Sequence, residues 1–240
     1  MLNLSIGILI NICGKLNICT SISPPSPSPK TLPHILKKNY FILFLSLIGT
    51  FTFGQTNYEH KLTEFDSLLH KEIYRVDVAE FQKLELIKFI NGKFEGSLTH
   101  SLWKTNKREE QKREISQKIK IPEKMVEKLM TELKNSGYEK LKDCSEIKNC
   151  IVGLDGTTII FNFLQNGINQ SASYWELKSD YYYKTNSVEI PNEVMDARKT
   201  LEIINNEIDL EKQFQNFTSR LPIGKYMFNG VIMEKRKNVW

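Results

Sequence analysis

Acidic residues are missing from the start of this 240-residue chain. Residues 1–55 contain four lysines and no aspartate or glutamate, and the first carboxylate is Glu59. The formal net charge of +5 therefore arises almost entirely from this segment, because the remaining 29 basic residues face 28 acidic ones. A body of nearly balanced charge gives no reason to expect a nucleic acid or an anionic membrane as a partner. We expect neither.

Several motifs of catalytic chemistry are also absent. The chain has no G-x-x-x-x-G-K-[ST] or G-x-G-x-x-G phosphate loop, no H-E-x-x-H zinc motif and no G-x-S-x-G nucleophile elbow. We therefore expect no nucleotide cofactor and no metal. We interpret His60, His70 and His100 as surface or partly buried histidines of helices. A serine, histidine and aspartate triad stays open, because geometry rather than spacing defines it.

Residues 37–54 have the layout of a secretory signal peptide. Lys37 and Lys38 precede an apolar run, and small residues then lead to a cleavage site before Gln55. The run is shorter than the roughly 20 residues that cross a membrane as a helix. An uncleaved anchor and a buried helix are the alternatives. We predict a soluble exported protein, periplasmic or extracellular, with no stable membrane insertion after cleavage.

Residues 1–36 do not fit in front of a normal signal peptide. They carry a second apolar stretch and a segment rich in proline and serine. We interpret them as an upstream extension, with translation starting near Leu36. The alternative is an extended linker that follows a first anchor.

The mature region, residues 55–240, predicts a single α+β domain with a helical N-terminal half. Apolar residues recur at helical spacing over 58–73 and over 77–90, which indicates an antiparallel helical pair. A further helix is predicted over 122–137, where a proline begins it and a glycine ends it. The basic segment 104–120 is expected to be a solvated helix or a mobile connection.

Turn signals mark the second half as antiparallel strands. Asp155 with Gly156, and Asn166 with Gly167, are dipeptides of tight hairpin turns. A similar Asn-Gly pair at 229–230 predicts a C-terminal hairpin, and a long helix that begins at Pro191 is expected to pack on the sheet. The predicted meander has three strands, at 150–154, 157–164 and 168–177.

Cysteine is scarce, and only Cys144 and Cys150 fall in the mature region. We predict a structural disulfide between them, because an oxidising compartment would let them pair. Their spacing places them on different sides of a helix, so a disulfide requires a turn through residues 145–149. Two free thiols and a redox or metal pair are the alternatives, and the metal alternative lacks nearby histidine ligands.

Aromatic residues gather after the predicted meander, at Tyr174, Trp175, Tyr181, Tyr182 and Tyr183. In an extended segment, consecutive tyrosines point to opposite faces, so at least one of them should be exposed. Tyrosine and tryptophan are good contact residues. We therefore predict a non-catalytic binding module that recognises a protein or a cell-surface glycan through these five residues. The alternatives are ordinary aromatic packing and an exported hydrolase whose site forms only in the fold.

Overall fold

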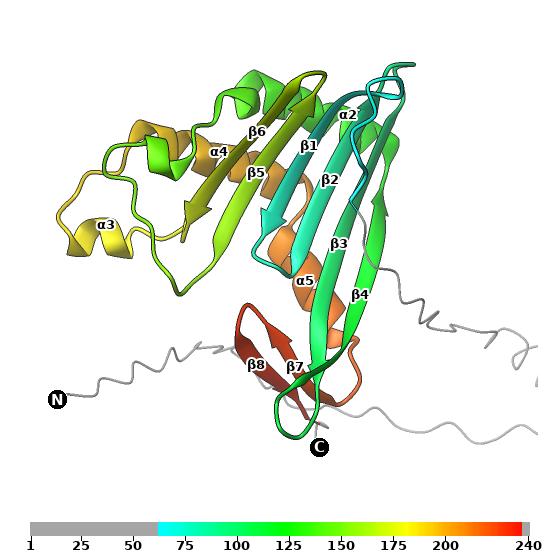
Figure 1. The fold of residues 1–240 in the computed structure, drawn as a ribbon, viewed down its shortest axis with the longest axis vertical. Coiled ribbons are helices and arrows are strands. Elements are labelled where there is room, and N and C mark those ends of the chain that lie inside the picture. The colour runs from blue at the N-terminus through cyan, green and yellow to red at the C-terminus, as the bar shows by residue number, and fades with distance from the viewer. Residues whose placement is uncertain (1–61, 237–240) are drawn as a thin grey trace, which may run out of the picture. The chain divides into compact units, whose positions relative to one another are not determined.

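The computed structural model describes residues 62–236 (Figure 1). The predicted upstream extension, the signal peptide at 37–54 and its cleavage site lie outside these residues, as does His60. Within the described part of the chain, no helix is long and apolar enough to cross a membrane. Eight strands form one antiparallel sheet, and the helices pack against it.

The helical N-terminal half predicted from the sequence is wrong. The segments at 70–78 and 82–89 are strands, and the basic segment 104–120 falls mainly in strands as well. The first four strands are β1 (His70–Val78), β2 (Gln82–Phe89), β3 (Phe94–Thr105) and β4 (Gln111–Ile121).

This error has a physical cause in the burial of both faces of β1 and β2. Tyr74 and Leu86 belong to the main core, which the helices cover. Ile73 and Ile87 are paired across the two strands and are also buried, although strand alternation places them on the opposite face. Apolar residues therefore do not alternate strictly with polar ones, and their spacing resembles that of a helix.

The opposite face is partly covered by the segment that precedes β1. Thr63 Oγ1 donates a hydrogen bond to Glu85 Oε1 at 2.7 Å. Glu85 also forms an ion pair with Arg75 at 2.8 Å, and Arg75 in turn donates to the carbonyl oxygen of Thr63. Arg75 and Glu85 are thus paired with each other and with the segment that covers them.

The strands are ordered β6-β5-β1-β2-β3-β7-β8, and β4 pairs with β3 outside this path. β3 pairs with β2 along its first part, and its end pairs with β7 at Trp103 and Lys104. The β7–β8 hairpin therefore lies at the far end of the sheet from β5 and β6 in strand order (Figure 1). The remaining strands are β5 (Thr158–Gln165), β6 (Ile168–Trp175), β7 (Gly224–Phe228) and β8 (Val231–Lys235).

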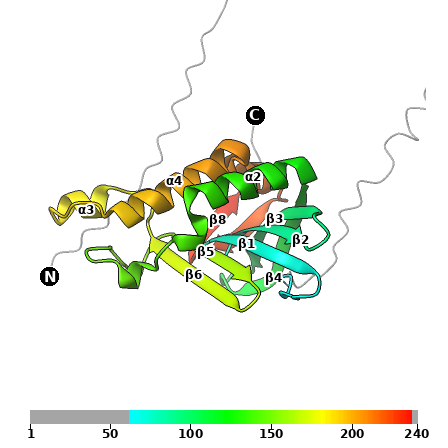
Figure 2. The same cartoon turned by 90° about the horizontal axis from the view of Figure 1, so that it is seen from above.

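Two of the three predicted meander strands exist, as the β5–β6 hairpin, and the C-terminal hairpin is also present. The third predicted strand, at 150–154, is a loop instead. The helices predicted after Pro122 and Pro191 form as α2 and α4, and both lie over the same face of the sheet (Figure 2). The helical elements are α2 (Glu123–Ser136), η1 (Tyr138–Lys140), η2 (Cys144–Glu146), α3 (Tyr181–Thr185), α4 (Asn192–Glu207) and α5 (Leu210–Ser219).

Candidate functional site: the cystine loop

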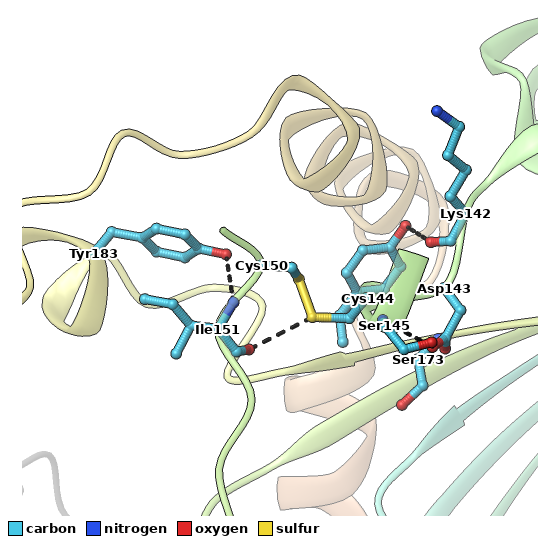
Figure 3. Close-up of a disulfide and its surroundings, with 9 residues drawn as sticks. Lys142, Asp143, Cys144, Ser145, Cys150, Ile151, Ser173 and Tyr183 are labelled. Carbon is cyan, nitrogen blue, oxygen red and sulfur yellow. Dashed lines mark hydrogen bonds between the residues drawn. A yellow bond between two sulfur atoms is a disulfide. The ribbon is translucent and has the colours of Figure 1, made fainter. Parts of the chain in front are cut away.

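The segment between η1 and β5 is closed on itself by a disulfide. The Sγ atoms of Cys144 and Cys150 lie 2.01 Å apart, and their Cα atoms lie 5.5 Å apart (Figure 3). The short helix η2 begins at Cys144 and supplies the turn that this pairing needs. We call residues 141–157 the cystine loop.

Asp143 attaches this loop to the outer edge of β6. Its Oδ1 accepts hydrogen bonds from the backbone N–H of Ser145 at 3.0 Å and from the Ser145 hydroxyl at 2.6 Å. Its Oδ2 accepts the backbone N–H of Ser173, in β6, at 2.8 Å. Burial acts to raise the pKa of Asp143, but these hydrogen bonds outweigh it and lower the pKa below its usual value. The carboxylate is therefore held as an anion.

Two buried tyrosines hold the cystine loop from inside the protein. The Tyr174 hydroxyl donates to the carbonyl oxygen of Lys142 at 2.6 Å. The Tyr183 hydroxyl accepts the backbone N–H of Ile151 at 3.5 Å (Figure 3). Tyr174 and Tyr183 are only 1% and 6% exposed. They therefore position the loop and contribute almost no area to the surface.

Trp175 holds the same loop further along the chain. Its indole Nε1 donates to the carbonyl oxygen of Asp155 at 2.8 Å. Gly153 lies against the indole ring so closely that a Cβ atom there would be 2.4 Å from it. This close contact explains why a glycine occupies position 153. A side chain there would overlap the indole ring and displace the loop from it.

The three consecutive tyrosines form the short helix α3 rather than an extended segment. Their side chains are therefore spread around a helix, with Tyr183 inside and Tyr181 outside. The Tyr182 ring lies 4.4 Å from Trp175 and 5.1 Å from Tyr181, measured between ring centroids. Of the five aromatic residues predicted as a contact surface, the structure thus links Trp175, Tyr182 and Tyr181 on the outside and buries the other two.

Two of the most exposed apolar residues of this region, Val152 and Leu154, were missed by the sequence analysis, which did name Tyr181. Leu154 is fully exposed, Val152 is 70% exposed, and Tyr181 is 63% exposed. Val152 and Leu154 flank Gly153, so the contact between Gly153 and Trp175 connects them to the aromatic residues. We call Val152, Leu154 and Tyr181 the loop surface. A signal was present in the alternation of larger apolar residues about Gly153, but it was interpreted as a strand.

The two histidines within the described residues, His70 and His100, lie in strands rather than in the predicted helices, and both contact neighbouring residues of the fold. His70 Nδ1 accepts the backbone N–H of Asp66 at 3.0 Å. His100 is completely buried in β3, and its ring stacks on Phe217 with a centroid distance of 5.4 Å. Burial lowers the pKa of His100 to about 4, so the imidazole is neutral at neutral pH. Neither residue belongs to the loop surface.

A cavity of about 340 Å³ lies beside the cystine loop and is lined mostly by apolar side chains. Two carboxylates line it, and one of them, Glu176, accepts the backbone N–H of Thr157 at 2.6 Å. Burial raises the pKa of Asp77, a shift typical of catalytic acids, but Asp77 points to the opposite face of the sheet from its neighbour Val78, which lines the cavity. Asp77 therefore does not line the cavity.

Among residues 62–236, no group of three or more metal-ligating side chains comes together. Comparison with known proteins finds no family model that matches the chain and no curated protein with a significant match.

Proposed function

We propose that this protein is an exported binding module that recognises a protein partner through the loop surface. The main observation that supports this proposal is that Val152, Leu154 and Tyr181 are strongly exposed although they are apolar or aromatic. Exposed apolar residues that gather at one place are typical of interaction sites, whereas isolated ones are not informative. Aromatic anchors surrounded by apolar contacts commonly provide most of the binding energy of such sites.

The attachment of the cystine loop supports a role in binding. The loop is held at several points, by the disulfide and by hydrogen bonds of Asp143, Tyr174, Tyr183 and Trp175. A loop that is already ordered loses little conformational entropy when it binds, so more of its contact energy is available as affinity. Val152 and Leu154 therefore belong to a loop that is fixed to the rest of the protein before a partner binds.

A protein partner fits the loop surface better than a glycan does. Sugar recognition by stacking requires an aromatic ring with an accessible face. Gly153 and Tyr182 both lie against the Trp175 ring, so Tyr181 is the one strongly exposed aromatic side chain of the loop surface. The exposed aliphatic side chains of Val152 and Leu154 match an apolar surface of a protein instead.

Export is the second part of the proposal. It is supported by the signal-peptide layout of residues 37–54 and by the disulfide. Disulfides persist mainly in oxidising compartments outside the cytosol.

Chemical crosslinking in the native exported fraction, followed by purification of the protein, tests the proposed function. We expect one protein to be crosslinked to the natural chain and its yield to fall at least tenfold when Val152→Ser and Leu154→Ser are combined. The matched control is Leu68→Ser, which changes an 83% exposed leucine before β1 and should leave the yield unchanged. Equal yields from the double variant and the natural chain would refute the loop surface as the binding site. A glycan as the only retained molecule would refute the protein partner.

A further inference from the structure

A single arginine holds the segment that leads from β6 into α3. The guanidinium of Arg198, in α4, donates hydrogen bonds to three acceptors, all within residues 177–180. Nε donates to the carbonyl oxygen of Leu177 at 2.7 Å, and Nη2 donates to that of Ser179 at 2.9 Å. Nη1 donates to Asp180 Oδ1 at 2.6 Å. We call Arg198 with these acceptors the Arg198 clamp.

The helix that carries Arg198 is fixed by the core. Val194, Ala197 and Leu201 of α4 are buried in the main hydrophobic cluster. The Arg198 side chain is itself only 19% exposed. A planar guanidinium on a fixed support defines both the position and the direction of its acceptors, which a single ammonium group cannot do. The clamp therefore places residues 177–180 relative to the core.

Asp180 stands at the N-cap of α3, but its side chain does not cap this helix. An aspartate at this position normally accepts a backbone N–H of the first helical turn. Here its carboxylate accepts Arg198 and also pairs with Lys184 at 3.5 Å, while the Tyr181 N–H donates to Ser179 Oγ at 3.2 Å. The hydrogen bond from Arg198 holds the pKa of Asp180 below its usual value, so the carboxylate is ionised at neutral pH. Asp180 thus connects α3 to α4 instead of capping α3.

Tyr181 directly follows the clamp and belongs to the loop surface. Its side chain is 63% exposed, so its own packing does little to fix it. The helix that carries it has only five residues, and a helix this short is not stable without contacts to the rest of the protein. The position of Tyr181 relative to Leu154 therefore depends on the contacts that hold α3. These are the Arg198 clamp before Tyr181 and the contacts of Tyr182 and Tyr183 after it.

We propose that Arg198 is a positioning residue for the loop surface, which holds Tyr181 in the place relative to Val152 and Leu154 that a partner recognises. This inference rests on the proposed function, because it assigns a role within the same binding site. Arg198 acts through Asp180 and α3, since its own side chain is mostly buried. Two contact regions that are each ordered before binding lose less conformational entropy when the partner binds, and they select partners that match their spacing.

The crosslinking assay of the proposed function, carried out with Arg198→Ala, tests this inference. We expect the yield of the crosslinked partner to fall about three- to fivefold, because Tyr181 is still present but must be ordered on binding. This is a smaller loss than that expected when Val152→Ser and Leu154→Ser are combined. Arg198→Lys keeps a charge for Asp180 but cannot contact all the acceptors, so its yield should lie between those of Arg198→Ala and the natural chain.

The matched control is Val194→Ala, on the side of α4 that faces the core. This variant removes buried methyl groups and should lower the melting temperature without changing the yield, at a temperature where the protein is folded. Asp180→Ala breaks the clamp at a side chain that is 42% exposed, where folding is not at risk, and should lower the yield in the same direction as Arg198→Ala. Equal losses of yield in Val194→Ala and Arg198→Ala would reduce the role of Arg198 to general stability and would overturn the inference.

Amide hydrogen exchange without the partner measures the clamp itself. The N–H groups of Lys184 and Asn186 donate to the carbonyl oxygens of Asp180 and Tyr182. We expect both to exchange faster in Arg198→Ala than in the natural chain, while exchange along β5 stays unchanged, because α3 opens locally. Unchanged exchange at both positions would overturn the inference.

The two assays together separate this inference from the proposed function. If the combined Val152→Ser and Leu154→Ser variant lowers the yield but Arg198→Ala and Asp180→Ala do not, Arg198 is not a positioning residue and the proposed binding site stands. If the yield is unchanged in all three, the loop surface is not the binding site, and the inference fails with it.

Discussion

Two strands at the margins of the sheet, β6 and β4, are protected in different ways. The outer edge of β6 is covered by the cystine loop, which reaches it through Asp143 and the backbone N–H of Ser173. β4 pairs with β3 alone among the described strands, and it carries exposed lysines at positions 112, 118 and 120. Coverage and charge both discourage unwanted pairing of a strand edge. Only the covered edge also supports an exposed apolar surface.

This difference separates an edge that is protected by charge from the edge that carries the proposed binding surface. The charged edge of β4 needs no specific geometry, because repulsion and hydration of lysines act over the whole strand. The covered edge of β6 depends on a disulfide, on two buried tyrosines and on the contact between Trp175 and Gly153. The β4 edge is thus protected without a specific structure, whereas the β6 edge carries the loop through which we propose that a partner binds.

The largest change in the free energy of unfolding should come from lowering the pH, because His100 in β3 is buried. The pKa of His100 is about 4 in the folded protein and near 6.5 when unfolded, so between these values the unfolded chain binds the proton more readily. Proton uptake therefore favours unfolding, and stability falls as the pH falls through this window. We expect a loss of at most roughly 3 kcal/mol between pH 6.5 and pH 4, measured by urea unfolding.

The control for this prediction is His100→Gln, which keeps a polar side chain without a titrating ring. The difference in stability between the two proteins should shrink or reverse as the pH falls from 6.5 to 4. A constant difference across this range would show that His100 does not carry the acid sensitivity.

Loss of the disulfide, which lies in the loop that covers β6, should cause the next largest decrease in the free energy of unfolding. Replacing Cys144 and Cys150 together by serine removes the constraint on the unfolded chain, and the chain-entropy model gives a cost of roughly 2 to 2.5 kcal/mol for so short a loop. Urea unfolding at pH 7.5 measures this cost. Equal stability of the two proteins would mean that the hydrogen bonds of Asp143 and the tyrosines are sufficient to hold the loop.

A smaller effect is expected from Gly153→Ala. The added Cβ would lie 2.4 Å from the Trp175 ring, so the loop must move, at a cost of about 1 to 2 kcal/mol. Lys118→Ala on the β4 edge is the matched control, and we expect its effect on the free energy of unfolding to lie within about 0.5 kcal/mol. If both variants changed the free energy of unfolding by the same small amount, the β6 edge would not depend on specific contacts more than the β4 edge does.

Parts of this structure follow from local sequence signals. Pro122 and Gly137 bound helix α2, and Gly137 has the positive φ of 87° that favours glycine at a helix end. The Asn-Gly pairs at 166–167 and 229–230 predict the β5–β6 and β7–β8 hairpins. These features depend on a few neighbouring residues, which is why sequence alone indicates them.

Other parts depend on contacts between distant segments. Ile73 and Ile87 are buried on the face opposite the helices, which no local pattern reveals, and the resulting spacing suggested helices. Tyr181 and Tyr183 differ in exposure because 181–185 is a helix packed against the cystine loop. Leu154 follows Gly153, and Gly153 lies against Trp175, which is about 20 residues further along the chain in β6. Burial and contact partners of this kind are set by the fold as a whole.

Amide hydrogen exchange of the native, oxidised protein with and without its crosslinked partner tests the central claim most directly. We predict that the partner slows exchange at residues 151–157 and 181–185, while exchange along β4 stays unchanged. Slower exchange along β4 with no change in the cystine loop would contradict the account, because it would place the interaction at the charged edge of the sheet.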